Sequence, residues 1–298
     1  MSNAATNPIP PADAPKSLLD RIGVALPVAL TALATAFAGL STGELQRAMF
    51  WRTYAAQDQA KATSQWTLAG FKRDRALICQ VAAAQLRATG GGGNPFAREA
   101  AGPRPAAAVR PADWLADGSP PPAKLPDIAD EALADLLAAV RTRAPEAELV
   151  RHAQKVSAAA VNAAIDAAEK SVEQTDRDWD PTLKAAAKLA ADGAGTPTGV
   201  AAQAAGFELD RRRYQIEAGL NQGVGFLYEA RIKVSSAESD KHQRKSKNFF
   251  YAMLAAQVGA TVAALALARQ RQSLLWAVAG GTGLVALVIG ASVYLSDL

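Results

Sequence analysis

The chain has 298 residues, 70 of which are alanine, and a formal net charge of +4. A single cysteine, Cys79, and two histidines, His152 and His242, exclude a disulfide framework and any CxxC site and leave little for a zinc or haem site. Because alanine is the best helix former and strand-favouring residues are scarce, the composition predicts an all-α fold.

In chain order, the first predicted elements are a disordered tail over residues 1–15, which carry four prolines, and a transmembrane helix over residues 16–41. The run Ile22–Leu40 has no charged residue in 19, which gives about 28 Å of helix against a hydrocarbon core of about 30 Å. Only two basic residues, Lys16 and Arg21, precede this run, which favours an uncleaved signal anchor. A cleaved signal peptide is the alternative.

The next two segments differ in proline content. Residues 42–89 contain no proline and are predicted to form a polar stalk helix. Residues 90–126 hold eight of the sixteen prolines together with six glycines. Such a sequence cannot bury enough apolar surface to offset its ordering entropy, so we predict a linker there.

Alanine-rich helices are predicted over residues 127–198, where isolated prolines separate them. The first is predicted to have Asp127 as its N-cap and Asp130 in its first turn, since aspartate is favoured at helix starts. The expected helices run over about residues 127–143, 146–178 and 182–191, and a glycine-rich loop follows over residues 193–199.

A second stalk helix is predicted over residues 199–248. Residues recur there at a 4-3-4-3 spacing, as in a coiled-coil seam, and we expect this interaction seam to join helices and copies of the chain. Both stalks leave the same membrane face and are expected to be antiparallel neighbours, with two unrelated helices on the membrane surface as the alternative. The seam residues are Ile216, Leu220, Gly223, Leu227, Ala230, Val234 and Ala237.

Two more transmembrane helices are predicted over residues 249–267 and 273–295, which contain no charged residue. Small residues let helices approach closely in lipid, and Gln257 is expected to hydrogen-bond between helices. The absence of ionisable side chains in the spans argues against ion-coupled transport. The predicted packing residues are Ala252, Ala256, Gln257, Ala260, Ala264, Ala286 and Gly290.

A basic cluster precedes the second span and is predicted to bind anionic lipid headgroups through Lys241, Arg244, Lys245 and Lys247. Because a membrane anchor accounts for this cluster, the basic isoelectric point near 9.2 does not lead us to expect a nucleic-acid partner. Counting Lys and Arg near all three spans places residues 42–248 in the cytoplasm, whereas counting only short loops gives the opposite orientation.

The sequence matches known catalytic and phosphate-binding motifs only in part. Gly39–Gly43 fits G-x-S-x-G, but an apolar helix precedes it where a nucleophile elbow needs a strand. Gly193–Gly199 lacks the lysine of a phosphate-binding loop. Arg211–Arg213, between acidic residues, is interpreted as a solvated helix face. We therefore predict no enzymatic activity, no cofactor and no metal, and interpret the histidines as solvated and Cys79 as a buried apolar residue.

Two groups of residues carry a likeness to a known family. The first is the Ala-Thr-Ser-Gln-Trp sequence at residues 62–66, followed by Lys72, Arg73 and Arg75. The second comprises Lys241-His242, Phe249 or Phe250, Gln257, the Arg269-x-Arg271 turn, Leu275-Trp276 and a glycine-rich last span.

With these motifs the chain resembles the uncharacterised bacterial membrane proteins catalogued as domain of unknown function 4337. The resemblance covers about residues 20–88 and 225–295, and residues 90–198 look like an expansion. It implies one N-terminal span, a helical middle with a Gln-Trp motif and a C-terminal pair of spans. The family has no agreed activity, so it implies no catalytic residues.

Together these features predict an all-α integral membrane protein of the bacterial inner membrane, with three transmembrane helices and an elongated helical stalk or coiled-coil region. Its expected role is that of a non-enzymatic membrane-anchored scaffold or assembly subunit that is homo-oligomeric. Its expected partners are the lipid bilayer, further copies and an unidentified protein. The alternative is a pore- or channel-forming effector whose lining includes Gln257 and the threonines of the spans.

Overall fold

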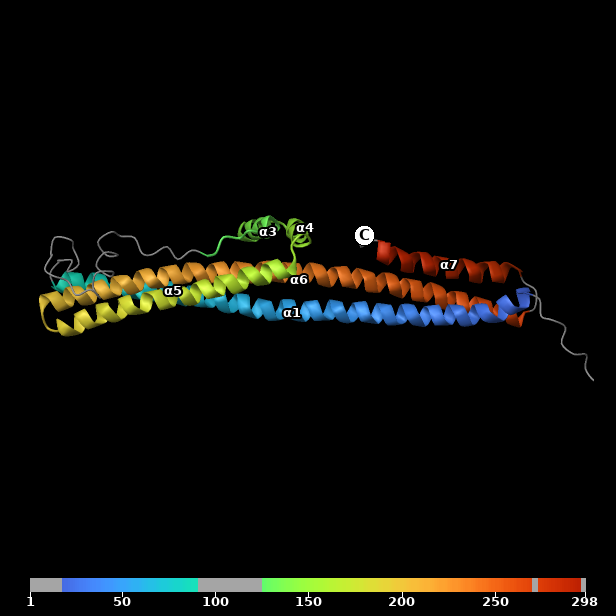
Figure 1. Cartoon of the computed structure of the whole chain (residues 1–298), viewed down its shortest axis with the longest axis horizontal. Helices are drawn as coiled ribbons and strands as arrows, with labels where there is room; N and C mark the ends of the chain where they lie inside the picture. The colour runs from blue at the N-terminus through green and yellow to red at the C-terminus, as the bar shows by residue number, and fades with distance from the viewer. Residues whose placement is uncertain (1–17, 91–124, 270–272, 296–298) are drawn as a thin grey trace, which may run out of the picture. The chain divides into compact units, whose positions relative to one another are not determined.

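The structure, a computed structural model, describes residues 18–90, 125–269 and 273–295, and these are helical apart from short connections (Figure 1). No strand occurs in these ranges, so the predicted all-α class is confirmed. The predicted tail and nearly all of the predicted linker lie outside the described residues. The helices are α1 (Leu18–Gly90), α3 (Glu131–Arg141), α4 (Glu146–Ala153), α5 (Ala158–Asp192), α6 (Pro197–Ala268) and α7 (Ser273–Leu295).

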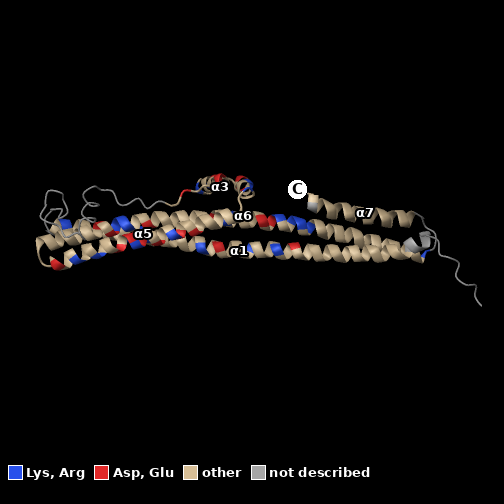
Figure 2. Ribbon diagram, in the orientation of Figure 1, with Lys and Arg blue, Asp and Glu red and all other residues tan. Residues whose placement is uncertain are grey.

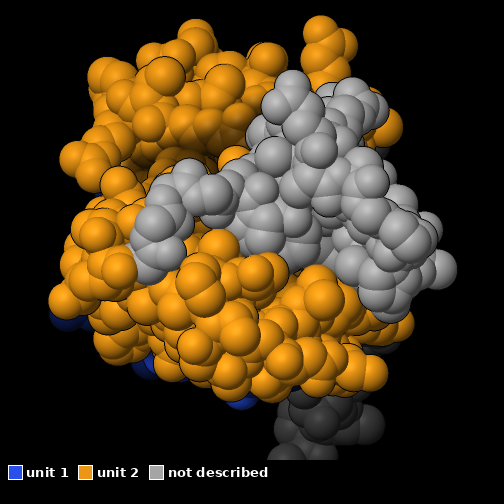
Figure 3. Space-filling model, turned by 90° about the vertical axis from the view of Figure 1, so that its left-hand side faces the viewer, with its two compact units in different colours: residues 1–50, 239–298 blue, residues 51–238 orange. Residues whose placement is uncertain are grey.

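The chain divides into two compact units, which Figure 3 distinguishes by colour. Unit 1 comprises residues 1–50 and 239–298, and unit 2 comprises residues 51–238. Helix α7 belongs to unit 1 and α3, α4 and α5 belong to unit 2, whereas α1 and α6 contribute to both. Helices α1 and α6 therefore continue without a break through residues 41–42 and 248–249, where the predicted transmembrane segments join the predicted stalks.

Side-chain caps fix where two helices of unit 2 begin. Asp130 caps α3, and its carboxylate accepts the N–H of Leu133 at 2.9 Å. The prediction of Asp127 as the N-cap is wrong, because residues 127–129 lie before the helix. Ser157 caps α5 in the same way, accepting the N–H of Ala160 at 3.1 Å. The prediction of one helix over residues 146–178 is wrong, because α4 ends at Ala153 and the Ser157 cap opens a new helix.

Pro181 does not end a helix. Helix α5 continues through it to Asp192, so the prediction of a separate helix over residues 182–191 is wrong. A proline in a helix interior removes one backbone hydrogen bond and crowds the preceding turn, at a cost of about 3 kcal/mol. Trp179, Thr182 and Ala186 are buried on either side of it, and we attribute the continuity of α5 to their packing.

A tight turn joins α5 to α6. Gly195 has a φ of +79°, which side chains with a Cβ rarely adopt. A Cβ added to Gly193 would lie 2.8 Å from the Cα of Gly199, so the two ends of the turn close only on glycine. Helix α6 then starts at Pro197, whose missing N–H is no loss in a first turn, and the Thr196 hydroxyl accepts the N–H of Gly199 at 3.1 Å.

In unit 2, α1 and α6 run antiparallel. The partners on α6 descend in number as those on α1 ascend, because Asp58 pairs with Arg231, Lys72 with Glu217 and Arg87 with Glu208. One apolar cluster joins these two helices to α3, α4 and α5. The predicted antiparallel arrangement is confirmed within this unit.

Unit 1 contains the three predicted spans, and the helices that carry them are long and apolar enough to cross a membrane. Here too α1 and α6 are antiparallel, since Phe37 stacks on Phe249 with ring centroids 6.2 Å apart, while Glu44, later in α1, contacts His242, earlier in α6. Helix α7 packs against both through small residues. A Cβ on Gly290 would collide with Phe37, and a Cβ on Gly259 of α6 would lie 2.6 Å from the Thr282 hydroxyl.

Candidate functional site

A groove of about 450 Å³ lies between α1 and α6 in unit 1. It is within the predicted spans, and its lining contains no charged side chain. Small and uncharged polar side chains form its walls, whereas large aliphatic side chains such as Leu284 and Val288 cover the exposed face of α7. The residues of this intramembrane groove are Thr31, Ala34, Thr35, Ala38, Gln257, Ala260 and Thr261.

The polar groups of the intramembrane groove differ in how they are satisfied. The hydroxyls of Thr31, Thr35 and Thr261 each donate to the carbonyl one turn earlier in the same helix, at 2.8, 2.9 and 2.9 Å. The carboxamide of the exposed Gln257 has no hydrogen-bond partner among the described residues. Because an amide in hydrocarbon needs such a partner, Gln257 is the groove's unsatisfied group.

The predicted packing residues of the spans fall into two sets. Ala252, Ala256, Ala286 and Gly290 are buried among the three helices, as a packing role requires. Ala260 lines the intramembrane groove and Ala264 is exposed. A spacing of four residues advances about 40° around a helix at each step, so a ladder of four cannot stay on one face. The buried face of α6 instead continues through Gly259 and Ala263.

Next to the predicted spans, hydrogen bonds between α1 and α6 hold the two helices in the same antiparallel alignment. Ser41 and Ser246 exchange hydrogen bonds between each hydroxyl and the partner's carbonyl, at 3.0 and 2.9 Å. The Ser239 hydroxyl donates to the carbonyl of Ala48 at 2.9 Å. Ser41, the serine of the G-x-S-x-G match, thus has a helix-packing partner and no histidine beside it in these contacts.

Both histidines face carboxylates, so their interpretation as solvated is incomplete. His242 Nδ1 lies 2.6 Å from Glu44 across the α1–α6 interface of unit 1. His152 Nε2 lies 3.8 Å from Glu148 in α4. The helical spacing of His152 and Glu148 was visible in the sequence, whereas the 198-residue separation of Glu44 and His242 gave no such signal.

The basic cluster of α6 lies directly beside the apolar span (Figure 2). Lys241, Arg244 and Lys247 are exposed, and Lys245 is half-buried. Their positions fit the predicted headgroup contacts, which stay a prediction because the structure contains no lipid.

The most deeply buried charges lie in unit 2. Arg231 of α6 is 7% exposed and Asp58 of α1 is 1% exposed, and the guanidinium binds the carboxylate through Nε at 2.7 Å and through Nη2. The remaining Nη1 donates to Asn162 of α5 at 3.0 Å. One guanidinium therefore joins three helices, and its planar fork suits this geometry better than an ammonium would.

Two tyrosines flank this guanidinium. Arg231 lies 5.1 Å from the ring centroid of Tyr54 and 4.8 Å from that of Tyr228. The Tyr228 hydroxyl donates to Glu169 of α5 at 2.7 Å. Burial, followed by this hydrogen bond, raises the pKa of Tyr228 far above its ordinary value, so the phenol keeps its proton.

A second charged group lies further along α6. Lys72 pairs with Glu217, whose pKa is raised by burial against the opposing effect of Lys72 and Arg213. Burial would also raise the pKa of Glu208, but hydrogen bonds from Arg211 and Arg212 outweigh it and lower that pKa. The arginines of residues 211–213 are thus half-buried partners of these acids, and their interpretation as a solvated face is wrong.

The Gln-Trp pair behaves as packing residues. Trp66 packs on Gly225, where an added Cβ would lie 3.2 Å from the indole. The edge of one ring faces the other in its contact with Phe226, and the two ring centroids are 4.9 Å apart. The indole Nε1 donates to Glu229 at 2.8 Å. Among the residues that the structure describes, the buried Oε1 of Gln65 has no hydrogen-bond partner.

The predicted interaction seam lies inside the chain. Six of its seven residues are buried, and Ile216 is half-buried. Leu125 packs on Gly223, which has no room for a Cβ, while Leu227, Ala230 and Val234 join the core shared with α3 and α5. The seam therefore joins helices of one chain, and an assembly of copies needs a different surface.

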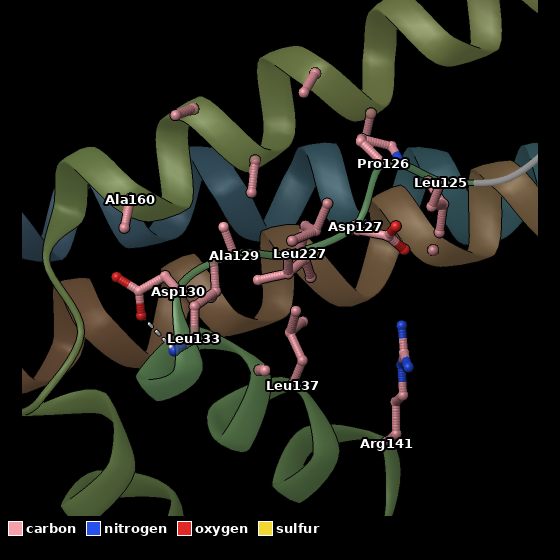
Figure 4. A pocket seen from close by; sticks show the side chains of 17 residues that line it. Leu125, Pro126, Asp127, Ala129, Asp130, Leu133, Leu137, Arg141, Ala160 and Leu227 are labelled. Atoms are coloured by element: carbon pink, nitrogen blue, oxygen red, sulfur yellow. Dashed lines mark hydrogen bonds between the residues drawn. The ribbon is translucent and has the colours of Figure 1, made fainter.

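An apolar pocket of about 590 Å³ lies between α3, α5 and α6 in unit 2 (Figure 4). Leu133, Leu137 and Leu227 form its walls with a row of alanines from α5. Asp127, Asp130 and Arg141 stand at its edge, and Asp130 is occupied by the cap of α3. Charges of both signs at the edge give the pocket no preference for an anion or a cation.

The described part of the chain holds no group of three or more His, Cys, Asp or Glu side chains able to bind a metal ion. Cys79 is buried and free, and burial raises the pKa of its thiol, which disfavours the reactive thiolate. No known family, curated protein or solved structure matches the chain. The family resemblance therefore stays a prediction.

Proposed function

We propose that the chain is a non-enzymatic, membrane-anchored helical scaffold that assembles with further copies of itself. The observation that carries the proposal is the use of its buried charges. Arg231 binds Asp58 of α1 and Asn162 of α5, so this buried arginine is used to hold three helices together. In several proteins buried polar groups specify how helices align, and we propose that this cluster does so here, as a scaffold requires.

The proposed location is the bacterial inner membrane, with residues 42–248 in the cytoplasm. Three apolar helices support a multi-pass protein. The basic residues beside the second span support the orientation through the positive-inside rule. A reporter fused after Leu298 tests it, because three spans place the C-terminus on the side of the central region. Activity of a cytoplasm-restricted reporter is expected, and activity of a periplasm-restricted one would reverse the orientation.

Particle size tests the assembly. The full-length protein is extracted into lipid nanodiscs, and its mass is measured over a hundredfold range of protein concentration. After the mass of the lipid and the nanodisc belt is subtracted, a fixed mass that contains at least two 31.0 kDa chains is expected, with or without a second protein. A single copy at every concentration, with no other protein bound, would contradict the scaffold.

One observation favours a pore-forming effector as the second candidate. The structure gathers Thr31, Thr35, Gln257 and Thr261, which the sequence proposed as a polar lining, around one intramembrane groove. Steady single-channel conductance of the purified protein in planar bilayers, lost in Gln257→Leu, would favour the pore over the scaffold.

A further inference from the structure

The α1–α6 pair of unit 1 has two lateral grooves, and they are occupied differently. Helix α7 fills one of them, where Gly259, Gly283 and Gly290 allow contact with Thr282, Leu30 and Phe37. The other is the intramembrane groove described above, and no described helix covers it. Its walls carry Ala and Thr in place of the large aliphatic side chains that face lipid on α7.

We propose that the intramembrane groove binds the same groove of a second copy of this chain, with the two Gln257 carboxamides hydrogen-bonded to each other. The inference rests on the proposed scaffold and names its contact surface. It replaces the interaction seam, which is buried within one chain.

The unsatisfied carboxamide of Gln257 selects the partner. It carries a donor and an acceptor, so two such groups satisfy each other. Copies of one chain insert in the same direction, and a two-fold axis along the membrane normal therefore brings the two Gln257 residues to equal depth. A partner without a matching polar group at this depth would leave the amide unpaired in hydrocarbon.

The small side chains of the groove determine how closely a helix can approach. Ala34, Ala38 and Ala260 keep the backbones accessible, and close backbone approach drives helix association in lipid. The threonine hydroxyls already donate to their own helices, so they add no unpaired donor to the contact. Ala264, exposed beyond Ala260 and Thr261, extends this small-residue face along α6.

Cysteine cross-linking in native membranes tests the surface. Thr261→Cys is placed in a Cys79→Ser background, which retains Gln257. Leu284→Cys is the matched control, because it lies 65% exposed on α7 two residues from Thr282, the contact of Gly259. Under mild oxidation Thr261→Cys is expected to give a disulfide-linked dimer on a non-reducing gel, and Leu284→Cys is expected to stay monomeric.

The carboxamide is tested with Gln257→Leu in the Thr261→Cys background, with Val258→Leu as the control at an exposed neighbour. An interhelical hydrogen bond in lipid contributes about 1–2 kcal/mol in model peptides, so dimerisation is expected to weaken about tenfold in Gln257→Leu and to stay unchanged in Val258→Leu. Equal dimerisation of Gln257→Leu and the parent would overturn the amide pairing.

The remaining outcomes separate this inference from the proposed scaffold. Equal cross-linking of Thr261→Cys and Leu284→Cys would show random collision and overturn the groove contact. A particle of several copies in which Thr261→Cys does not cross-link would overturn the groove contact but leave the scaffold standing. A particle of one copy with no other protein bound would overturn both.

Discussion

At the scale of single residues, Arg231 is the buried charge that connects α1, α5 and α6 in unit 2. Its guanidinium binds Asp58 and Asn162 and lies between two tyrosine rings. Removing one partner of a buried ion pair leaves the other charge uncompensated, at a cost of about 3–5 kcal/mol. Arg231→Ala is therefore expected to lower the free energy of unfolding by that amount, measured by urea denaturation of the full-length protein in detergent.

Two variants control this prediction. Arg177→Ala breaks an exposed pair with Glu173, whose side chains are 69% and 68% exposed, and is expected to cost less than about 0.5 kcal/mol. The double variant Arg231→Met with Asp58→Leu removes both charges and is expected to recover most of the lost stability. If Arg231→Ala costs no more than Arg177→Ala, the buried pair is not formed.

Glu208 gives the chain a testable dependence on pH. Its pKa is lowered below the ordinary 4.5 because hydrogen bonds from Arg211 and Arg212 outweigh burial. A lowered folded-state pKa adds stability above pH 4.5, and this stability is lost as pH falls through the folded value. Glu208→Gln is expected to flatten the acid side of a plot of unfolding midpoint against pH. An unchanged acid slope in Glu208→Gln would contradict the pairing with the arginines.

At the scale of helices, the continuity of α5 across Pro181 is the least expected feature. Pro181→Ala restores a backbone donor and removes a clash, so it is expected to raise the free energy of unfolding by up to about 3 kcal/mol. Pro197→Ala is the control, because proline suits the first turn of α6 and its replacement brings no gain. Thermal unfolding followed by circular dichroism measures both. No gain from Pro181→Ala would mean that α5 is interrupted there.

The register of α1 against α6 in unit 1 predicts a specific disulfide. The hydroxyl oxygens of Ser41 and Ser246 are 3.2 Å apart, so cysteines at both positions in a Cys79→Ser background are expected to bond within one chain. Ser41→Cys with Asp240→Cys is the control, since residues 240 and 246 are about 9 Å apart along a helix. Protection from maleimide labelling measures the bond. Equal labelling of both pairs would contradict the register.

The sequence predicted the helices well where signals are local and less well where tertiary packing decides. The three uncharged runs needed no partner to be recognised, whereas the cap of α3 was predicted at Asp127, three residues before the actual cap at Asp130. The break at Ser157 was missed because the serine lies in an alanine-rich run. Pro181 was expected to separate two helices, because the packing of its neighbours Trp179, Thr182 and Ala186 within unit 2 is not visible in the sequence.

At the scale of the whole molecule, the sequence located several candidate residues but not their partners. Gln257 and the threonines were recognised as polar groups in the spans, and the structure adds that they share one groove. The heptad seam was recognised by its spacing, but spacing cannot tell a contact within one chain from a contact between copies. The pairing of Asp58 with Arg231 joins residues 173 positions apart and left no local signal.

The proposed scaffold requires lipid to be the solvent of the three apolar helices, which are long and apolar enough to cross a membrane. Membranes from cells that make the full-length chain are washed at alkaline pH, which strips peripheral proteins, and then sedimented without detergent. The chain is expected to stay entirely in the pellet and to enter the supernatant only when detergent is added. Release of the intact chain by the alkaline wash alone would contradict the account.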